Sequence, residues 1–233
     1  MESLRDKFTA IVIGASGGIG SAACAELKKN PRCGTLVALS RESAPALDLT
    51  DSASIADAAA QVKKNHGTAD LVFVASGILA PAGKGPEKSI RHLDMADMSE
   101  VFAINALGPA LVARHFAPLL PRDSKSVLAF LSARVGSISD NRLGGWISYR
   151  AAKAALNQIV RTTAIDVARS RPSSVCLALH PGTVDTALSS DFTTAYEKFT
   201  PAESARQLLQ VMDQKSPSQS GGFFAYDGEK IEW

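Results

Sequence analysis

The sequence predicts an α/β fold: one doubly wound domain, residues 1–233, in which helices cover both faces of a parallel sheet of about seven strands. Three observations lead to this prediction. Short runs rich in Val, Ile, Leu and Phe alternate with longer, alanine-rich segments of helical period, which is the rhythm of β-α-β units. Several apolar runs are continuous, as expected of parallel strands buried on both faces. With 45% hydrophobic residues the chain can build a large core, and no linker or internal repeat marks a second domain.

The apolar runs predict seven strands. In chain order these are Phe8–Ile13, Thr35–Leu39, Ala46–Asp48, Leu71–Ala75, Val127–Ser132, Val175–His180 and Phe223–Tyr226. Five segments of helical period lie between them, near Gly20–Lys29, Ser52–Lys64, Ala96–Leu119, Ser148–Ser170 and Ala202–Gln214. The stretch Pro81–Ser89 is expected to be a mobile surface loop because it is rich in Pro and Gly.

The charge balance argues against nucleic acid or a membrane surface as the main partner. The chain carries 25 basic and 23 acidic residues and has no basic tract or acidic tail. No apolar stretch approaches the ~20 residues that cross a bilayer. The N-terminal sequence MESLRDKF reaches the first apolar run within a few positions, which leaves no room for a secretory signal. The expected location is therefore cytoplasmic.

Neither the cysteines nor the histidines predict a metal site. The three cysteines have no CxxC spacing, so buried or free thiols in a reducing compartment are expected of Cys24, Cys33 and Cys176. No acidic partner stands at ligand spacing from the four histidines, and core or surface positions are expected for His66, His92, His115 and His180.

A glycine-rich turn directly follows the first strand. It reads GASGGIG, and its Gly14, Gly18 and Gly20 open an alanine-rich segment. In a β-α-β unit such glycines permit a tight turn and a close approach of the backbone to a pyrophosphate, while the helix N-terminus offers free N–H groups and a favourable dipole. The stretch predicts a dinucleotide site of the Rossmann type, and the alternative is a flexible connector.

A tyrosine and a lysine stand four residues apart in the sequence YRAAK. Positions i and i+4 lie on one helix face, so the Tyr149 hydroxyl and the Lys153 ammonium can share a site. Taken alone, this spacing is better explained by a tyrosine ring packed beside a solvated lysine. It gains weight from its combination with the glycine turn.

The spacing G-x-x-x-G-x-G, together with Tyr149-x-x-x-Lys153, resembles the short-chain dehydrogenase/reductase family in its classical, single-domain form. The resemblance covers nearly the whole chain and extends to the motifs ALDLTD, VFAINALGP and LHPGTVDT. The stretches RVGSISDNRLGGWISYRAAKAALNQ and GGFFAYDGEKIEW look like the C-factor-like subgroup. The resemblance implies an NADP(H)-dependent oxidoreductase that interconverts a small-molecule carbonyl and an alcohol, as a homodimer or homotetramer.

In this family the residue that ends the second strand chooses between the two nicotinamide cofactors. An acidic residue there would bind the ribose hydroxyls and repel a 2′-phosphate, whereas this chain has Ser40 and then Arg41, whose guanidinium can bind that phosphate. NADP(H) is therefore expected in preference to NAD(H). Gly17 stands where NADP-using relatives often carry a second basic residue, and the alternative for Arg41 is a solvated surface arginine.

The resemblance also implies which residues hold the cofactor. Asp48 with Leu49 would lie beside the adenine, although Asp48 could instead cap the helix near Asp51. The backbone of Val184 and the hydroxyl of Thr186 would hold the nicotinamide carboxamide. The full set is Gly14, Ser16, Gly18, Ile19, Gly20, Ser40, Arg41, Asp48, Leu49, Ser76, Gly77, Tyr149, Lys153, Pro181, Gly182, Val184 and Thr186.

Carbonyl reduction needs a hydride from the cofactor and a proton for the developing alkoxide, and the resemblance assigns the proton to Tyr149. A phenol pKa of about 10 is high for this exchange, but the Lys153 ammonium and the oxidised nicotinamide both favour the phenolate. Lys153 would also hold the nicotinamide ribose. Asn105 would fix a water that relays protons to Lys153, or else be an asparagine at a helix kink.

The serine that polarises the carbonyl in relatives is the main departure. Relatives carry Ser-Ser before x-x-Gly, with the second serine catalytic, whereas LSARVG has Ala133 in that place and retains only Ser132. Because side chains alternate along a strand, a shift of one residue could point Ser132 away from the site. A bulge could correct this, and Ser137 or Ser139 could substitute. Ser132 is the expected fourth catalytic residue.

A second reading is a dinucleotide-binding signalling or regulatory protein in which catalysis has weakened. Ala133 favours this reading, and the joint presence of Tyr149, Lys153 and Asn105 opposes it. The segment Asp185–Phe199 is expected to cover the substrate, and Trp146 is expected either in the pocket wall or in the core.

Overall fold

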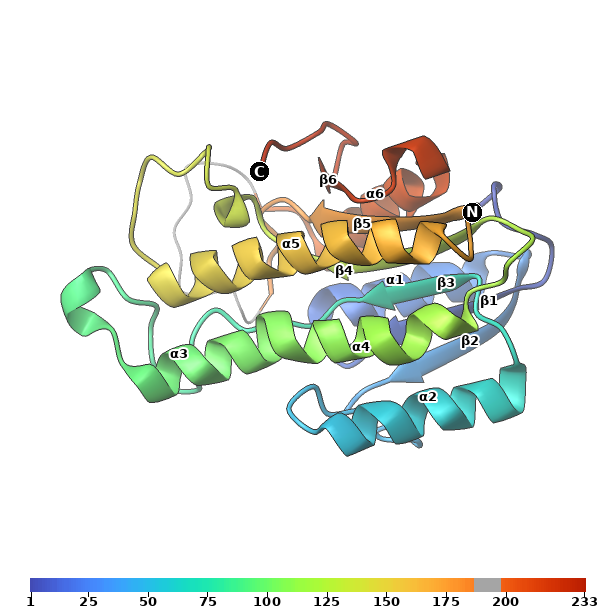
Figure 1. The fold of residues 1–233 in the computed structure, drawn as a ribbon, viewed down its shortest axis with the longest axis horizontal. Coiled ribbons are helices and arrows are strands. Elements are labelled where there is room, and N and C mark those ends of the chain that lie inside the picture. Colours follow the sequence, from blue (N-terminus) through green and yellow to red (C-terminus); the bar gives the residue numbers. More distant parts are fainter. Residues whose placement is uncertain (187–197) are drawn as a thin grey trace.

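The protein is described by a computed structural model over residues 1–186 and 198–233. In these residues a parallel sheet lies between two layers of helices (Figure 1). The sheet has six strands in the order β2-β1-β3-β4-β5-β6, with bounds β1 Phe8–Ile13, β2 Cys33–Leu39, β3 Leu71–Val74, β4 Ser126–Leu131, β5 Ser174–His180 and β6 Gly222–Ala225. The main helices are α1 Gly18–Lys29, α2 Ser52–His66, α3 Met95–Phe102, α4 Gly108–Phe116, α5 Ile147–Ala168 and α6 Pro201–Gln214.

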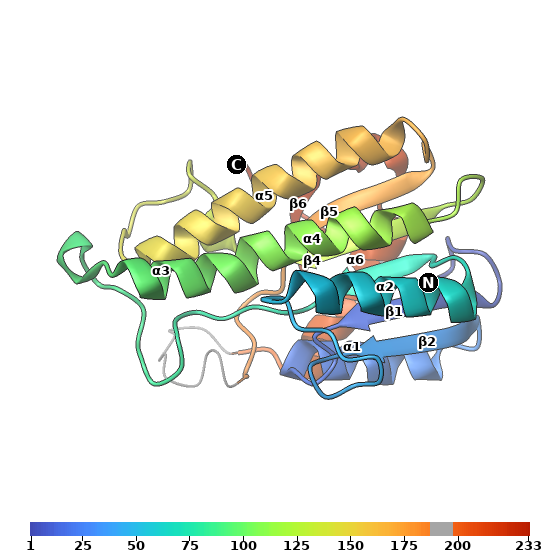
Figure 2. The same cartoon turned by 60° about the horizontal axis from the view of Figure 1, so that its bottom comes forward.

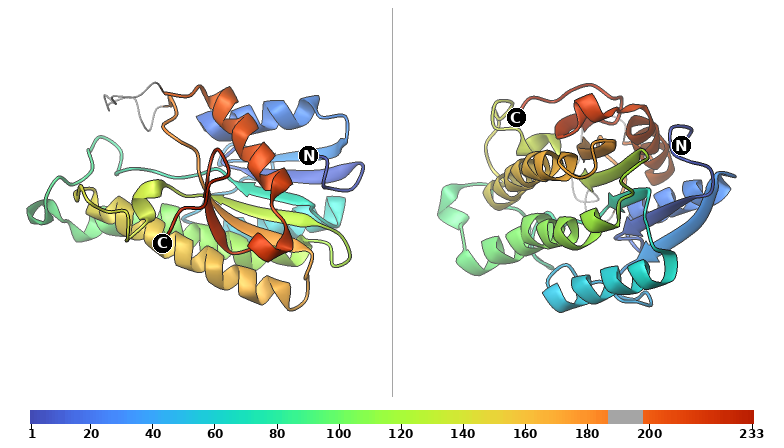
Figure 3. Two further views of the ribbon diagram at one scale, coloured as in Figure 1. Left: turned by 90° about the horizontal axis from the view of Figure 1, so that it is seen from above. Right: turned by 45° about the vertical axis from the view of Figure 1, so that its right-hand side comes forward.

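The two helical layers explain why the central strands are continuously apolar. Helices α2, α4 and α5 lie on one face of the sheet, and α1 and α6 lie on the other (Figure 3). On β1, Ile11 and Ile13 pack into the first layer, while Ala10 and Val12 pack into the second. All four side chains are buried, as in a parallel strand covered on both sides. The predicted doubly wound α/β fold is confirmed.

The strand expected at Ala46–Asp48 is absent, which is why the described sheet has six strands and not about seven. The backbone amides of this segment form hydrogen bonds with groups that do not belong to a neighbouring strand. The amide of Leu47 donates to the Ser40 carbonyl (2.8 Å), and the amide of Asp48 donates to the Ser54 hydroxyl (2.9 Å). The apolar side chain of Leu47 lies in the core beneath α2, α4 and α5, although its backbone does not pair with another strand.

The segment predicted as one helix, Ala96–Leu119, is a nearly straight rod that contains one wider turn (Figure 2). Helix α3 passes at Ala103–Leu107 into a π-helical turn, α4 continues from it, and a short 3-10 turn at Ala117–Leu119 ends the rod. A π turn accommodates one extra residue and is frequent at functional sites. Here it contains Asn105, which is fully buried.

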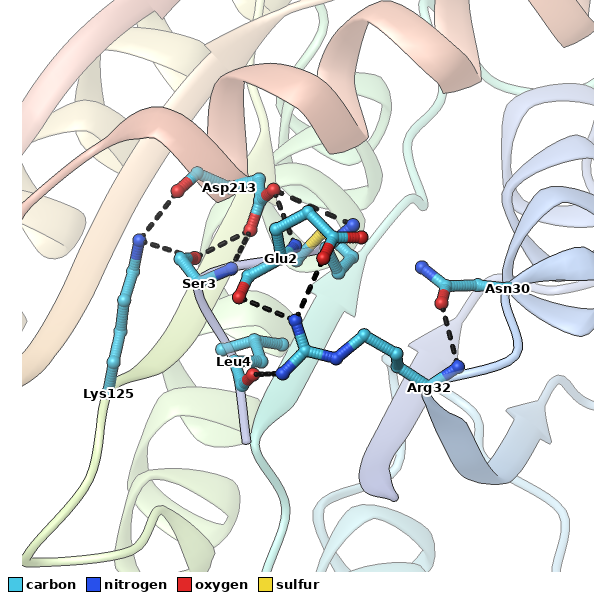
Figure 4. Close-up of polar contacts among 8 residues, drawn as sticks. Glu2, Ser3, Leu4, Asn30, Arg32, Lys125 and Asp213 are labelled. Atoms are coloured by element: carbon cyan, nitrogen blue, oxygen red, sulfur yellow. Dashed lines mark hydrogen bonds and ion pairs between the residues drawn. The ribbon is translucent and has the colours of Figure 1, made fainter. Parts of the chain in front are cut away.

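The N-terminal residues are fastened at the amino ends of the strands (Figure 4). The carboxylate of Asp213, in the last turn of α6, accepts hydrogen bonds from the amides of Glu2 (2.7 Å) and Ser3 (2.9 Å). Lys125 donates to the Ser3 hydroxyl and to the Asp213 carbonyl, both at 2.7 Å, and Arg32 donates to the carbonyl of Glu2 at 2.7 Å. These contacts join the first residues to α6 and to the segments that precede β2 and β4.

In the described part of the chain, no helix is long and apolar enough to span a membrane. Nor do those residues contain a group of three or more His, Cys, Asp or Glu side chains placed to hold a metal ion. All three cysteines are free.

Candidate active site

Most of the predicted site residues lie in the turns that follow β1 to β5. Because the strands are parallel, these turns meet at the carboxyl edge of the sheet, where open α/β sheets bind their ligands. Neighbouring turns are joined by backbone hydrogen bonds, from the Gly14 amide to the Leu39 carbonyl (2.9 Å) and from the Ser132 amide to the Leu179 carbonyl (2.7 Å).

The glycine turn leaves no space for a side chain at Gly14 or Gly20. Gly14 has a φ of +84°, and a Cβ there would lie 2.3 Å from the Ser76 hydroxyl oxygen. A Cβ on Gly20 would lie 2.2 Å from the Gly14 carbonyl oxygen. Helix α1 begins at Gly18, and no side chain caps it because its N-cap residue is Gly17. The first N–H groups of α1 and the positive end of its dipole are therefore available to an anionic ligand.

The segment after β5 reaches this turn through Thr186. A Cβ on Gly18 would lie 2.8 Å from Cγ2 of Thr186. Gly182 has a φ of +78°, and a Cβ there would lie 2.8 Å from the Phe199 ring. Of the segment Asp185–Phe199 that was expected to cover the substrate, residues 187–197 lie outside the described residues. The other predicted cofactor residues of these two turns are the exposed Ser16, the half-buried Pro181 and the buried Ile19 and Val184.

The turn after β2 carries Arg41. Ser43 organises this turn, because its hydroxyl accepts the Ser40 amide (2.8 Å) and lies within donating distance of the carbonyl oxygens of Pro45 (2.6 Å) and Ser40 (2.8 Å). The Ser40 hydroxyl accepts the amide of Glu42 (3.2 Å). Arg41 itself is exposed, two residues after the end of β2.

Asp48 lies near Arg41 but does not cap α2. The helix is capped by Asp51, which accepts the amide of Ala53. Asp48 instead accepts hydrogen bonds from the amide and the hydroxyl of Thr50 (2.8 and 2.7 Å). These bonds lower the pKa of Asp48, and the positive charge of Arg41 adds a smaller contribution in the same direction. The neighbouring Leu49 is buried.

Tyr149 and Lys153 are buried together on one face of α5. The Lys153 amine nitrogen lies 5.7 Å from the centre of the Tyr149 ring and donates to the Leu131 carbonyl at the end of β4 (2.9 Å). Gly77, after β3, completes the enclosure: a Cβ there would lie 3.3 Å from Lys153 Nζ and 2.8 Å from the side-chain oxygen of Asn105. The structure thus brings Tyr149, Lys153, Asn105 and Gly77 to one place.

Burial changes the proton affinity of both side chains. It lowers the pKa of Lys153 to about 7, because the ammonium loses its hydration. It also raises the pKa of Tyr149, because the phenolate would lose its hydration. In the chain without a bound cofactor, burial therefore dominates the pKa of Tyr149, and the expected lowering by the Lys153 ammonium and the oxidised nicotinamide stays a prediction.

Asn105 lies in the π turn and binds the segment after β3. Its amide nitrogen donates to the carbonyls of Ile78 (2.8 Å) and Val101 (3.0 Å), and its amide oxygen accepts the Ile78 amide (3.2 Å). The side chain is therefore used to brace the loop that contains Gly77. Asn105 was expected either at a helix kink or near Lys153, and it lies both at a helix irregularity and beside Lys153. Its part in a water relay stays a prediction.

Ser132 follows β4, and its side chain points to α5. The hydroxyl donates to the amide oxygen of Asn157 (2.7 Å), whose nitrogen donates to the Gly136 carbonyl (3.4 Å). Ser132 is 2% exposed. Because a hydroxyl has a single hydrogen, this bond uses the one that would polarise a substrate carbonyl.

The other nearby serines are also bound within the protein. The hydroxyl of Ser137 lies 2.5 Å from the Glu232 carbonyl and 3.3 Å from the hydroxyl of Ser139. Ser148 donates its hydroxyl to the carboxylate of Glu87. Trp146 is half-buried at the N-cap of α5, so it is neither a core residue nor a fully exposed one.

Two side chains near the site were not predicted from the sequence. Asn157 continues the spacing of Tyr149 and Lys153, four residues further along α5, so a polar stripe on a buried helix face could have revealed it. Glu87 is 61 residues from Ser148 and carries no local signal, because only the folded chain brings the two together.

The chain fits a nicotinamide dinucleotide. The uncapped start of α1 suits a pyrophosphate, and the glycines of the turn keep side chains away from that position. Gly77 keeps a Cβ out of the space beside Lys153 and Asn105. These features follow the Rossmann pattern, in which the ligand crosses the carboxyl edge of the sheet.

The chain is similar to proteins of one family. A family model described as short chain dehydrogenase matches residues 8–197. C-signal of Myxococcus xanthus is 39% identical over 147 residues, which are 62% of this chain and 84% of that protein. The 1-hydroxy-2-glutathionyl-2-methyl-3-butene dehydrogenase of a Rhodococcus species is 32% identical over 189 residues, which are 81% of this chain and 79% of that protein.

Solved structures agree with this family. The NADPH-bound carbonyl reductase from chicken fatty liver has a TM-score of 0.86 and 28% identity, over 99% of this chain and 95% of that one. A Burkholderia multivorans protein with bound NADP has a TM-score of 0.79 and 27% identity, over 97% and 99% of the two chains. The chain belongs to the short-chain dehydrogenase/reductase family of nicotinamide-dependent oxidoreductases, and to its C-factor-like type.

Proposed function

We propose that the chain interconverts a small-molecule carbonyl and an alcohol with NADP(H), and that Tyr149 donates or accepts the proton. The observation that carries this proposal is the enclosure of Tyr149 and Lys153 on one face of α5, at the carboxyl edge of the sheet and beside Gly77. The bound cofactor would supply the hydride in the reducing direction and accept it in the oxidising direction.

The proton chemistry follows from burial. The raised pKa keeps Tyr149 a phenol at neutral pH, which is the form that can donate to an alkoxide. An alkoxide is a much stronger base than a phenolate, so transfer of this proton is downhill. Lys153, with a pKa of about 7, exchanges protons readily at neutral pH, and its positive form stabilises the phenolate that remains.

The preference for NADP(H) rests on the turn after β2. Ser40 has no charge to repel a 2′-phosphate, and the exposed guanidinium of Arg41 can form charge-assisted hydrogen bonds with it. The NADPH-bound and NADP-bound structural neighbours support the same choice.

The assignment of Ser132 as the carbonyl-polarising residue stays a prediction, and the geometry sets a condition on it. Its hydroxyl would have to leave Asn157 to donate to a substrate. While that bond persists, Tyr149 is the donor that carries the reaction.

The second candidate function is that of a dinucleotide-binding regulatory protein with weakened catalysis. It is favoured by Ala133 and by the bond that occupies Ser132. One experiment separates the two candidates: NADPH binding by fluorescence, together with NADPH oxidation against a panel of aldehydes, ketones and quinones. Binding with turnover supports the enzyme, and tight binding without turnover of any substrate supports the regulatory protein.

A further inference from the structure

The turn that precedes α5 is held in an unusual backbone conformation. Gly144, Gly145 and Trp146 follow one another with φ values of +64°, +66° and +52°. Glycine adopts this left-handed region without strain, but a bulky residue such as tryptophan does so only where its surroundings enforce it. Trp146 is the N-cap residue of α5, and its own side chain forms no capping hydrogen bond.

Contacts from Glu87, in the loop between β3 and α3, help to hold this turn, together with the Arg150 side chain, which donates to the Gly145 carbonyl (3.0 Å). The amide of Trp146 donates to the Glu87 carbonyl. Ser148 donates its hydroxyl to one carboxylate oxygen of Glu87 and its amide to the other (3.4 Å). A carboxylate at this position also interacts favourably with the positive end of the α5 dipole. Glu87 therefore caps α5 from a distant part of the chain.

We infer that Glu87 is a positioning residue for Tyr149, an inference that rests on the proposed proton-transfer role of that tyrosine. Ser148 is 1% exposed and directly precedes Tyr149, which is the third residue of α5. The backbone carbonyl of Glu87 holds Trp146 and its carboxylate holds Ser148, so the side chain of Glu87 acts on the start of the helix, and hence on the place of the Tyr149 hydroxyl, through Ser148. A proton donor displaced by about 1 Å can lose on the order of 100-fold in rate.

The stretch Pro81–Ser89, predicted as a mobile surface loop, makes two side-chain contacts with helices. Glu87 binds Ser148 of α5, and Lys84 pairs with Asp97 on α3 (2.6 Å). The loop is thus bound at two places. Only the Glu87 contact leads to the catalytic helix, so Lys84 offers a matched control.

The test compares Glu87→Ala, Glu87→Gln and the control Lys84→Ala. In Glu87→Ala we expect kcat to fall about 10- to 100-fold, while KM and the dissociation constant for NADPH change less than about twofold. Glu87→Gln keeps one oxygen acceptor for Ser148 and should recover most of the rate. Lys84→Ala should retain the rate of the unmodified protein. The double variant Glu87→Ala/Ser148→Ala should lose little more than Glu87→Ala alone, since the two residues act through one contact.

Hydrogen exchange provides a readout that needs no turnover. In Glu87→Ala the amide of Ser148 should exchange at least about tenfold faster, and in Lys84→Ala it should not. If the unmodified protein turns over no substrate of the panel, the proposed function fails and this exchange measurement alone decides whether Glu87 holds the helix start.

Three results would overturn the inference. One is a Glu87→Ala variant with kcat within about twofold of the unmodified protein. Another is a loss of kcat that matches losses of Tm and of NADPH affinity and is not recovered by Glu87→Gln, which would make Glu87 a general stability residue. The third is an exchange rate for the Ser148 amide that is the same in Glu87→Ala and Lys84→Ala.

Discussion

The Ser132 hydroxyl donates to the amide oxygen of Asn157 at 2.7 Å, and this bond ties the end of β4 to α5 about two turns beyond Tyr149. Through it, Ser132 braces α5, and its only hydroxyl hydrogen is engaged with Asn157. Ala133, the next residue, offers no hydroxyl at all. A hydroxyl at position 133 would therefore give the site a second hydrogen-bond donor, besides Tyr149, for a substrate carbonyl.

We expect Ala133→Ser to raise kcat/KM for a simple carbonyl substrate by about tenfold or more, because it adds one donor for the developing oxyanion. If the Ser132 hydroxyl stays on Asn157 during turnover, Ser132→Ala should affect the melting temperature more than kcat, because it removes only the bond to Asn157. Steady-state kinetics and thermal unfolding of both variants test this. A loss of about 100-fold in kcat for Ser132→Ala without a change in Tm would show instead that Ser132 leaves Asn157 and serves as the donor.

Tyr149→Phe should abolish turnover while NADPH binds nearly as tightly as before. The change removes the proton donor and keeps the ring that packs against Lys153. Lys153→Met should impair both turnover and binding, because the amine lies in the space that Gly77 leaves open. The measurements are NADPH oxidation and fluorescence titration. If Tyr149→Phe kept more than about a tenth of the rate, a loss below ~1.4 kcal/mol, Tyr149 would not be the proton donor.

NADPH should bind more tightly than NADH, and Arg41→Ala should remove most of the difference. The guanidinium is the exposed positive charge at the end of β2, and phosphate binding through such a charge is lost when the charge is removed. The matched control is Arg91→Ala, an exposed arginine in another loop, which should leave the preference unchanged. Fluorescence titration that gives equal affinities for the two cofactors in the unmodified protein would contradict the assignment.

The contribution of Lys153 to the free energy of unfolding should rise between about pH 7 and about pH 10.5, while above about pH 8.5 the raised thiol pKa values of Cys24, Cys33 and Cys176 act in the opposite direction. Burial lowers the pKa of Lys153 to about 7, against about 10.5 in an unfolded chain. In this interval the unfolded chain binds more protons at Lys153 than the folded one, so this contribution to stability increases with pH, by at most about 1.4 kcal/mol per pH unit for a single group. Below pH 7 both states are protonated, and the cost of burying the charge is fully present.

Urea unfolding at several pH values tests this, with Lys153→Met as the comparison. The variant should be more stable than the unmodified protein at pH 7 and should show a flatter dependence on pH. Equal slopes for the two proteins would mean that Lys153 keeps an ordinary pKa in the folded state.

Asp213→Asn should destabilise the fold by about 1–2 kcal/mol and leave catalysis unchanged. Asp213 accepts hydrogen bonds from the amides of Glu2 and Ser3 and from the Ser3 hydroxyl, and an amide side chain can replace only part of them. The site lies at the amino edge of the sheet, away from Tyr149. Chemical denaturation and NADPH oxidation measured on the same sample test both parts. A loss of activity larger than the loss of folded protein would contradict the separation of the two edges.

The sequence predicted the parts of this protein that depend on local patterns. Apolar runs predicted the buried strands, and closely spaced glycines predicted the turn after β1. The helical period predicted that Tyr149 and Lys153 lie on one face of a helix. The false strand at Ala46–Asp48 had the same local pattern, and only the hydrogen bonds to Ser54 and Ser40 distinguish it. Glu87 depends on a contact across 61 residues, which no short pattern encodes.

The directions of the pKa shifts could not be predicted from the sequence either. The pKa values of Tyr149 and Lys153 are set by how completely the fold removes water from them, and the spacing of the two residues says nothing about that. Likewise, the one-residue shift between Ser132 and Ala133 was visible in the sequence, but the partner that Ser132 would find, Asn157, depended on the packing of α5 against β4.

The wide turn at Ala103–Leu107 lets the rod of α3 and α4 hold one extra residue. Deleting one residue there would convert the turn to an ordinary α-helical one and leave α3 and α4 in nearly the same relative rotation, because the wider turn absorbs the extra residue. The surface of α3 that meets α5 would be kept, but Asn105 would no longer be held opposite Ile78. A protein engineer who wishes to exchange α3 between relatives should therefore cut on the far side of this turn and transfer it whole.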